Sequence, residues 1–554
     1  MTENKPNILF VNLLSISLVD IEARFDNKNL SRQSISMPLG IMYISSYIKK
    51  HSEIGQVGIL DYVLAIRELL DHGSVDDFIE QIAKRDAKFT PDMIAFSLNF
   101  SASYRFFEKA LSIISNIWPE ATVVVGGVHA TNTVEQLLKL QNVDFVVRGE
   151  AELSLAEFVN QFSRLDKVRV KGIYSKEDLK VSSPELELSD WATDLDDLPF
   201  PDWELIDMNK YITSRGRQRD LDGIKHRTAS LFTTRGCPFQ CTFCSAHTVH
   251  GRKVRFRSVK NIIDEIRLLY QKYRVTLIMP EDDLFTADKQ KVLTLLGEIK
   301  KMNIPGLELQ LPAGLSVNTL DEEIVDALIS VGLKIGCLAI ESGSEHTQRH
   351  IIKKNCDLRK ARRLVDLLKS KGVIVRCFFI MGFPNETKEL MRETVDYAKS
   401  LGADWCLFPI ATPLVGSEMY DQFVEMECIE NNVETWSYTD FDARNFDTPE
   451  IKGEELKEFV YRVNLECNFL NNPNKVNRQF EKAIRIYKDI ASLHPFHIIA
   501  WYCIMECYKG LGDEDRARET EEHIQKLIQT DKRASDMFAK YGDMMPSLNY
   551  ERAY

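Results

Sequence analysis

Three cysteines stand in one short stretch of the chain, Cys237, Cys241 and Cys244, with a C-x3-C-x2-C spacing. Thiolates are soft ligands that suit iron–sulfur clusters, and three of them leave one iron of a four-iron cubane with an open coordination position. Gly236 and Pro238 flank the first cysteine and are turn residues, which favours a loop wrapped around an inorganic core. The spacing therefore predicts a cluster whose open iron binds a cofactor or substrate.

A zinc site and three unligated core cysteines are the alternatives at this loop. Zinc normally takes a fourth cysteine or histidine, and His247 and His250 follow closely in the sequence. The remaining cysteines have no ligand spacing beyond the i, i+4 pair Cys503/Cys507, and most stand in apolar runs. We interpret them as small core residues, so a second cluster is not expected.

Length and charge restrict the class of protein. A chain of 554 residues predicts two to four domains, and a net charge of −12 argues against a nucleic-acid partner. No apolar run approaches the roughly 18 residues of a membrane span, and the first residues do not resemble a signal peptide. Clustered cysteines without a disulfide pattern favour a reducing compartment, so we expect a cytoplasmic enzyme.

Residues 1–160 alternate short apolar strands with amphipathic helices, which predicts an α/β domain with a doubly wound, Rossmann-like parallel sheet. Ligands of such sheets lie outside the carboxyl ends of the strands. The candidate binding residues at those ends are Ser97, Gly126, Gly127, His129, Gly149 and Glu150.

A less regular stretch, 161–228, is predicted to be a linker. Strand–helix alternation then resumes over 229–450, with strands expected at 230–236, 276–282, 307–314, 334–343, 373–383 and 405–413. Six such units predict a partial (β/α)6 barrel, although periodicity does not separate a barrel from a second open sheet.

Residues 451–554 predict an all-α domain with a tetratricopeptide-like (TPR-like) repeat. Ala483 and Ala517 occupy equivalent small-residue positions 34 residues apart, the tetratricopeptide period. Two repeats at most fit, so we expect this helical segment to dock on the barrel.

The cysteine spacing, with an aromatic residue before the last cysteine at the top of a first barrel strand, resembles the radical S-adenosylmethionine (SAM) superfamily. The resemblance implies that Cys237, Cys241 and Cys244 bind a [4Fe-4S] cluster and that SAM chelates the open iron. It further implies that the backbone of Phe243 meets the adenine, and that reductive cleavage of SAM yields a 5′-deoxyadenosyl radical.

Several segments over residues 5–425 resemble the cobalamin-binding radical SAM enzymes, among them Gly126-Gly127-Val128-His129, Val147-Arg148-Gly149-Glu150 and Leu198-Pro199-Phe200-Pro201. The resemblance implies cobalamin in the first domain and methylation of an unactivated carbon or phosphorus centre. The D-x-H-x-x-G motif that supplies an axial histidine elsewhere is absent, since His129 lacks both the preceding Asp and the following Gly. The alternative is a relic domain that only buttresses the barrel.

Polar residues that end later strands are the further cofactor candidates. By the same resemblance, at least one of Glu281, Asp282 and Asp283 would receive the SAM amino group, although acids here could equally cap the next helix. Glu341 and Ser342 are candidates for the SAM ribose and carboxylate. Arg376 is either a carboxylate partner or part of a structural ion pair. Arg255 and Arg257 would face the cofactor cleft or form a solvated strand face.

These observations predict a cobalamin-dependent radical SAM methyltransferase. A radical SAM cyclase, oxidase or rearrangement enzyme without methyl transfer is the first alternative, and a non-catalytic TPR adaptor is the second. We expect a small-molecule or peptide substrate and an external electron donor such as flavodoxin or ferredoxin. The helical segment could close the cavity, recruit a protein partner or mediate dimerisation.

Overall fold

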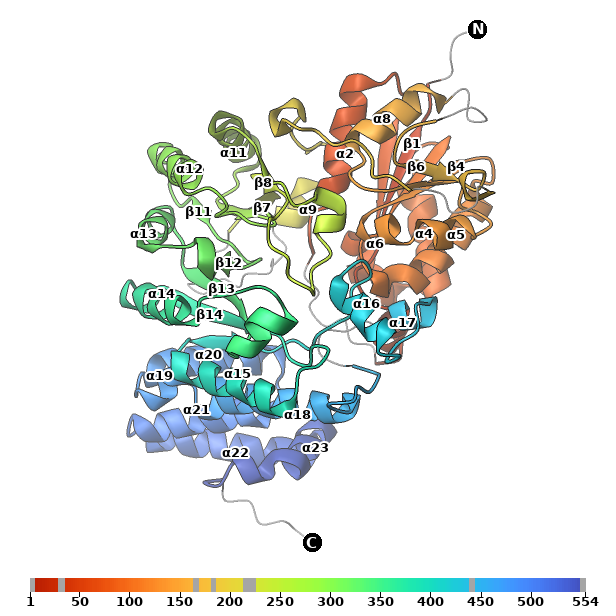
Figure 1. Cartoon of the computed structure of the whole chain (residues 1–554). Coiled ribbons are helices and arrows are strands. Elements are labelled where there is room, and N and C mark those ends of the chain that lie inside the picture. Colours follow the sequence, from red (N-terminus) through yellow and green to blue (C-terminus); the bar gives the residue numbers. More distant parts are fainter. Residues whose placement is uncertain are drawn as a thin grey trace. The chain divides into compact units, whose positions relative to one another are not determined.

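The computed structural model describes residues 5–27, 35–162, 169–180, 186–212, 226–437 and 444–548 (Figure 1). They fall into two compact units, each described by itself. The first comprises Met1–Lys334, Ile352–Lys354 and Thr412–Phe441, and the second Ile335–Ile351, Asn355–Ala411 and Asp442–Tyr554. In the part of the chain that the structure covers, every helix is too short or too polar to cross a membrane.

The first unit opens with a mixed six-stranded sheet in the order β2-β1-β3-β4-β5-β6. Its first five strands are parallel, which confirms the predicted parallel α/β sheet. The strands are β1 (Ile8–Asn12), β2 (Val57–Asp61), β3 (Met93–Ser97), β4 (Thr122–Gly126), β5 (Phe145–Val147) and β6 (Ile173–Ser175). The edge strand β6 pairs antiparallel with β5 and lies in the stretch predicted to be a linker. The sequence did not indicate this strand, because three residues are too few to show an alternating pattern.

Amphipathic helices cover both faces of this sheet because alternate side chains of each strand point to opposite faces. Phe10, Ala95 and Val147 pack on one face against α2 (Leu39–His51) and α8 (Glu152–Asn160). Phe96 turns to the other face and meets Phe107 of α5 edge to face. The helices of that side are α4 (Val75–Asp86) and α5 (Tyr104–Ile117), and α6 (Val128–Asn132) and α7 (Val134–Leu138) follow β4.

A second parallel sheet in the same unit has the order β11-β10-β7. Its strands are β7 (Thr228–Leu231), β10 (Leu277–Pro280) and β11 (Glu308–Leu309), and its helices are α11 (Val259–Tyr273), α12 (Lys289–Lys301) and α13 (Glu322–Ser330). Each helix begins at a side-chain cap, Ser258, Asp288 or Asp321, which satisfies an otherwise unpaired backbone N–H.

A short antiparallel ribbon closes the cysteine loop at its base. Strands β8 (Thr234–Arg235) and β9 (Arg255–Phe256) pair so that Arg235 stands opposite Arg255. The loop between them contains the three cysteines and the one-turn helix α10 (His247–His250).

The second unit contains the parallel strands β13 (Ile335–Glu341), β14 (Ile374–Phe379) and β15 (Trp405–Leu407), with α14 (Leu358–Ser370) and α15 (Lys388–Leu401) between them. All six strands expected over 229–450 are therefore present, three in each unit. Closure of these strands into one partial barrel stays a prediction.

The chain then becomes helical, as predicted for residues 451–554. The helices are α18 (Gly453–Leu465), the π-helix η8 (Glu466–Leu470), α19 (Pro473–Val476), α20 (Phe480–Leu493), α21 (Ile498–Gly510), α22 (Glu514–Thr530) and α23 (Lys532–Tyr541). Helix α21 is buried on nearly every side in the helical core, and Ala483 and Ala517 are both buried there. The tetratricopeptide assignment stays a prediction.

Asparagines of the helical segment bind the edge strand β15. The side chain of Asn468 accepts from the N–H of Cys406 at 2.7 Å and donates to its carbonyl at 2.5 Å, as a neighbouring strand would do. The buried carboxylate of Asp404 accepts from Lys482 at 2.6 Å and from Asn474 at 3.0 Å. These polar contacts, with Trp405 against Phe469, hold the helices on the sheet edge.

Replacing Asn468 by Ala is expected to lower the free energy of unfolding by about 2–3 kcal/mol, because the buried N–H and carbonyl of Cys406 lose their partner. Urea unfolding followed by circular dichroism measures this change. Asn471→Ala, at an exposed position in the same segment, is the matched control and should change stability by less than about 0.5 kcal/mol. Equal losses in the two variants would refute the edge-capping role.

Candidate functional site

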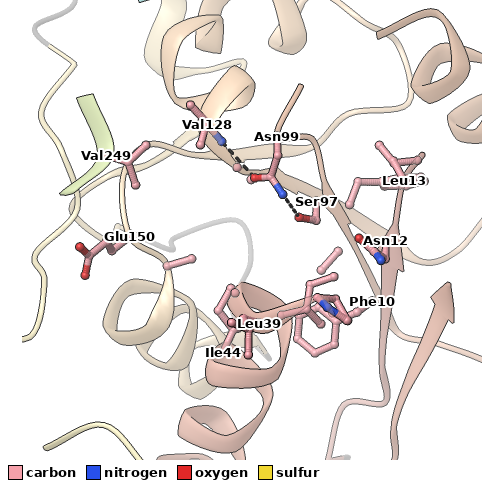
Figure 2. A pocket seen from close by; sticks show the side chains of 18 of the residues that line it. Phe10, Asn12, Leu13, Leu39, Ile44, Ser97, Asn99, Val128, Glu150 and Val249 are labelled. Carbon is pink, nitrogen blue, oxygen red and sulfur yellow. Dashed lines mark hydrogen bonds between the residues drawn. The ribbon is translucent and has the colours of Figure 1, made fainter. Parts of the chain in front are cut away.

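A cavity of about 410 Å³ lies in the first unit, where the parallel strands of the first sheet end (Figure 2). Asn12, Ser97, Gly126 and Gly149 line it from β1, β3, β4 and the turn after β5. In a sheet of order 2-1-3-4-5 the connections leave β1 and β3 in opposite directions, which opens a crevice at this point. The cavity therefore occupies the position predicted for a ligand.

The inner part of the cavity is apolar and reaches between the sheet and two helices. Ala95 of β3 is a small residue between Phe10 and Val124 on the neighbouring strands. Ile41 and Ile44 of α2 and Leu155 of α8 form the opposite side. An apolar slot with few polar groups suits a flat aromatic or hydrocarbon part of a ligand.

The glycines around the cavity fall into two groups. Gly127 and Gly149 have φ angles of 117° and 105°, and an added Cβ would lie 2.5 Å from the carbonyl oxygen of Leu98 or 2.7 Å from Oγ of Ser189. At these two positions the fold itself requires glycine, whether or not a ligand binds. At Gly40 a Cβ would meet no protein atom within 4 Å, and at Gly126 only Val147 at 3.6 Å. The last two leave space that a ligand can use.

Polar groups at the strand ends are few and fixed. The side chain of Asn99 donates to Ser97 Oγ at 3.1 Å and accepts from the N–H of Val128 at 3.3 Å, as the dashed lines in Figure 2 show. The amide of Asn12 donates to Asp61 at 2.9 Å, and burial raises the pKa of Asp61 to about 6. This side of the cavity thus offers a small number of oriented amide groups.

The facing part of the cavity wall comes from the second α/β region of the same unit. Ser230 and Phe232, near the end of β7, line the cavity together with Arg235, and Glu281 does so after β10. Glu281 accepts from Ser230 Oγ at 2.9 Å. Val249 of α10 completes this wall, so residues from both α/β regions enclose one space.

Glu150 is the charged centre of this wall. Its carboxylate accepts from Arg235 at 2.8 Å and lies 2.8 Å from Nδ1 of His250. It also accepts from both terminal nitrogens of Arg255, with a distance of 3.1 Å to Nη1. Burial alone would raise the pKa of Glu150, but His250, Arg235 and Arg255 together hold that pKa below its ordinary value. Glu150 is therefore an ionised carboxylate, and both of its oxygens are bound to side chains of the protein.

The arginines around Glu150 are anchored on aromatic rings. The guanidinium of Arg235 lies 5.2 Å from the ring centre of Tyr43, and its other end binds Glu152 at 2.7 Å. Arg255 lies 5.1 Å from the ring of Trp191. Such cation–π contacts are strongest where water is excluded.

Arg255 and Arg257 were expected to face the cofactor cleft or solvent, and the structure corrects both expectations. Arg255 is buried against Glu150, and Arg257 is buried with its guanidinium 2.5 Å from Glu265. Alternation along the strand predicted that both arginines share one face, but each is paired with a buried carboxylate, Arg255 with Glu150 from a distant segment and Arg257 with Glu265 of the following helix α11.

The cysteine loop begins at a point fixed by two acids. Asp282 accepts from the N–H groups of Thr233 at 2.6 Å and Thr234 at 3.1 Å, and Asp283 accepts from the N–H of Gly236 at 2.8 Å. Gly236 has a φ of 92°, and a Cβ there would lie 2.5 Å from the carbonyl oxygen of Lys253. Burial raises the pKa of Asp282 to about 6 although its bonds to Thr233 and Thr234 lower it.

Cys237, Cys241 and Cys244 form no disulfide and are half-buried in this loop. Burial raises the pKa of the Cys237 and Cys244 thiols, so without a metal these groups are neutral, whereas binding to a metal ion deprotonates a thiol. Among the described residues no three His, Cys, Asp or Glu side chains converge on one metal ion. A four-iron cubane does not require this, because each cysteine binds a different iron, so the donor set fits a cluster.

His247 and His250, the ligands that a zinc site could have used, point elsewhere. Nδ1 of His247 lies 3.1 Å from the carbonyl oxygen of Cys244, and Nδ1 of His250 is bound to Glu150. Phe243 is half-buried beside the last cysteine.

His129 is buried away from the cavity wall. Nδ1 lies 2.9 Å from Ser101 Oγ, and the ring meets Tyr104 and Trp436 edge to face. Burial lowers the pKa of His129 to about 3. The structure thus brings Ser97, Gly126, Gly127, Gly149, Glu150 and Glu281 together around the cavity, and does not bring His129 there.

The remaining candidates lie in the second unit. Glu341 ends β13 with a φ of 71°, a left-handed conformation that is uncommon outside glycine. Ser342 is buried, with Oγ 2.9 Å from Oγ1 of Thr394 on α15. Arg376 is half-buried on β14 and shares a strand face with Ile374 and Phe378, opposite the buried face of Val375 and Cys377.

Sequence reasoning missed Arg235 and His250 as cavity residues and Asn12 as a polar group at a strand end. Asn12 ends the apolar strand β1, so the rule that located Ser97 could have located Asn12. Arg235 and His250 depend on contacts between distant segments and carry no local signal.

Two families match this chain. Residues 231–398 match the radical SAM superfamily, and residues 29–159 match the B12 binding domain. The first match contains the three cysteines, and the second contains Ser97, Gly126 and Gly149, which line the cavity at or after the ends of β3, β4 and β5.

The chain is similar to several bacterial and archaeal proteins. An uncharacterized methyltransferase of Pyrococcus horikoshii is 31% identical over 387 residues, 69% of this chain and 78% of that protein. Cytidylyl-2-hydroxyethylphosphonate methyltransferase of Streptomyces wedmorensis is 28% identical, over 78% of this chain and 86% of the relative. Anaerobic magnesium-protoporphyrin IX monomethyl ester cyclase of Rubrivivax gelatinosus is 27% identical, over 76% and 70%.

A solved structure has the same fold. The cobalamin-dependent S-adenosylmethionine radical enzyme OxsB, with aqua-cobalamin and S-adenosylmethionine bound, superposes with a TM-score of 0.64. The comparison covers 99% of this chain and 85% of OxsB at 14% sequence identity.

Glu150→Gln is expected to lower the free energy of unfolding by about 3–5 kcal/mol at neutral pH, because it leaves the buried Arg255 without a counter-charge and leaves Arg235 with Glu152 alone. The pKa of Glu150 is lowered on folding, so this loss is complete above the ordinary glutamate value of about 4.3 and shrinks as the pH falls towards the folded value. Urea unfolding at several pH values measures it.

Glu120→Gln, at an exposed position, is the control and should cost less than about 0.5 kcal/mol. A Glu150→Gln protein that is as stable as this control would show that the ion-pair cluster does not stabilise the fold.

Proposed function

Because this chain belongs to the radical SAM enzymes that carry a B12-binding domain, we propose that it is a cobalamin-dependent radical SAM methyltransferase acting on an unactivated carbon or phosphorus centre. Relatives named as methyltransferases match it over most of their length. The observation that carries the proposal is the single cavity lined both by the strand ends of the B12-binding domain and by residues next to the cysteine loop. Methyl transfer between two cofactors needs such a shared space.

The cofactors divide between the two regions. Cys237, Cys241 and Cys244 would hold a [4Fe-4S] cluster, and SAM would complete the coordination of its open iron. When bound, SAM on the cluster supplies a 5′-deoxyadenosyl radical, and cobalamin supplies the methyl group. The chain's own contribution is to hold the two groups in one enclosed space and to exclude water from it.

The cavity fits a corrinoid by shape and by polarity. The apolar slot between the sheet and helices α2 and α8 suits the nucleotide base of cobalamin, and Gly40 and Gly126 leave room that no protein atom fills. Ser97, Gly127 and Gly149 are proposed to line the same ligand. His129 is not needed as an axial ligand in this proposal.

The residues proposed to contact SAM stay the same, except that Asp282 is given another role. Asp282 uses its carboxylate to hold the start of the cysteine loop, so we assign it a positioning role and leave the SAM ammonium to Glu281. Phe243, Glu341, Ser342 and Arg376 remain proposed contacts of the adenine, ribose and carboxylate.

The substrate is proposed to be a small molecule, as the phosphonate name of one relative suggests. The electron for SAM cleavage would come from an external donor such as flavodoxin or ferredoxin. A reducing cytoplasm suits both this donor and an oxygen-sensitive cluster.

A radical SAM cyclase is the second candidate, favoured by the similarity to the magnesium-protoporphyrin cyclase. The two candidates share the cofactors and differ in the product. Methylation adds one CH2 unit to the substrate, whereas cyclisation by the radical adds none. The cysteine triad and the enclosed cavity favour either enzyme over a non-catalytic adaptor.

Protein reconstituted anaerobically with iron and sulfide is expected to bind cobalamin and to show cob(II)alamin absorbance after gel filtration. Incubation with isotopically labelled SAM and cell extract is expected to yield a product heavier by one CH2 unit, detected by mass spectrometry. A Cys237→Ala, Cys241→Ala, Cys244→Ala triple variant should yield neither 5′-deoxyadenosine nor this product. Deoxyadenosine formed by wild type without a methylated product would instead favour the cyclase.

Gly40→Ala tests the proposed ligand space directly. The new methyl meets no protein atom, so helix stability should rise by up to about 1 kcal/mol. A bound corrinoid would be crowded at a cost of about 1–3 kcal/mol, which corresponds to about tenfold weaker binding or more. Unfolding by urea and cobalamin titration by absorbance measure the two effects.

Gly297→Ala is the matched control, because Gly297 lies within helix α12 and its added Cβ also meets nothing within 4 Å. This variant should be stabilised similarly and bind cobalamin like wild type. Unchanged cobalamin affinity in Gly40→Ala would place the ligand elsewhere.

A further inference from the structure

Helix α10 connects the cysteine loop to the cavity. It begins three residues after Cys244 and ends at His250. Oγ1 of Thr248 accepts from Asn132 of α6 at 3.0 Å, and the next side chain, Val249, lines the cavity. The helix therefore holds its last residue, His250, on the cavity wall next to Val249 and within hydrogen-bonding distance of Glu150; Figure 2 labels Val249 and Glu150.

Glu150 fixes the orientation of the His250 ring. Nδ1 of His250 lies 2.8 Å from the carboxylate, which is itself held by Arg235 and Arg255. An ionised carboxylate only accepts hydrogen bonds, so Nδ1 carries the proton. With Nδ1 as the donor to Glu150, Nε2 is the ring nitrogen that remains for a ligand, and it accepts a hydrogen bond in the neutral form of the ring.

This acceptor has no partner within the described part of the protein. The hydrogen bond of Nδ1 to Glu150 is the side-chain bond found for His250, and the side chain keeps 24% of its surface exposed. His250 lines the cavity, where the neighbouring acceptor Glu281 is already bound to Ser230. A fixed acceptor on a largely apolar wall selects a ligand that offers an N–H or O–H donor.

We propose that His250 is a cofactor-binding residue whose Nε2 accepts a hydrogen bond from a carboxamide side chain of the corrinoid. The inference rests on the proposed function, because it takes a corrinoid as the cavity's ligand. Carboxamides are the N–H donors at the rim of the corrin ring. Arg235 and Arg255 hold the carboxylate of Glu150, and Glu150 positions the ring of His250 that would contact the cofactor.

Ligation of cobalt by His250 is the competing role for the same atom. His250 belongs to the wall formed by the cysteine-loop region. If the methyl group leaves the corrinoid on that side, an imidazole bound to cobalt there would compete for the position of the methyl group. A hydrogen bond at the rim of the ring leaves this position free.

The test measures corrinoid binding by cluster-reconstituted protein, without turnover. Dissociation constants are determined by absorbance titration for cobalamin and for the cobalamin monocarboxylic acids, in each of which one carboxamide is hydrolysed to a carboxylate. Wild type is compared with His250→Ala, with His250→Gln, whose amide oxygen can accept the same bond, and with the control His51→Gln at an exposed position.

His250→Ala is expected to bind cobalamin about tenfold more weakly, His250→Gln to recover part of the loss, and His51→Gln to match wild type. One monocarboxylic acid should bind wild type about tenfold more weakly than cobalamin, and His250→Ala should not distinguish these two ligands. If His250→Ala does not fold, as judged by circular dichroism and iron content, His250→Gln and the acid series decide the question.

Equal cobalamin affinity of wild type and His250→Ala would overturn the inference, as would a monocarboxylic acid penalty that is the same in both. Electron paramagnetic resonance of bound cob(II)inamide, which has no base of its own, tests the competing role. Nitrogen superhyperfine splitting that disappears in His250→Ala would make His250 a cobalt ligand and overturn the hydrogen bond. Failure of wild type to bind any corrinoid would overturn the proposed function as well.

Discussion

The buried carboxylate of Glu150 is the interaction on which the candidate site depends. The antiparallel ribbon at the base of the cysteine loop places Arg235 directly opposite Arg255, and like charges in that arrangement repel. Glu150 lies between the two guanidiniums, and Glu152 pairs with the second terminal nitrogen of Arg235. Without Glu150 the ribbon would bury Arg255 as an unpaired cation, which is among the most costly defects a protein core can have.

One consequence is that the cysteine loop and the cavity cannot be arranged independently. Glu150 follows β5 of the B12-binding domain, whereas Arg235 stands two residues before Cys237. The same carboxylate orients His250 after the last cysteine. The loop is thus tied to the B12-binding domain at both ends, and the acids Asp282 and Asp283 fix its first residues to the second sheet. A radical formed at the loop and a group carried in the cavity need this kind of rigid spacing.

The second unit shows how a sheet edge is closed without another strand. Asn468 supplies both hydrogen bonds that β15 would otherwise exchange with a neighbour, and Asp404 gathers Lys482 and Asn474 beside it. The helices that follow are therefore part of the fold of this unit. We expected this helical segment to dock because at most two repeats fit in it, and its contacts with β15 agree with that expectation.

The sequence by itself determined the features whose signals are local. The spacing of Cys237, Cys241 and Cys244 indicated a cluster, and alternation of apolar runs located the parallel strands and the strand ends at Ser97, Gly126 and Gly149. Tertiary structure alone decided which charged side chains meet. It buried Arg255 against Glu150, 105 residues away, and it turned His129 into the core and His250 towards the cavity. The reason is physical: thiolate chemistry and strand periodicity act over a few residues, whereas the pairing of buried charges depends on segments that only folding brings together.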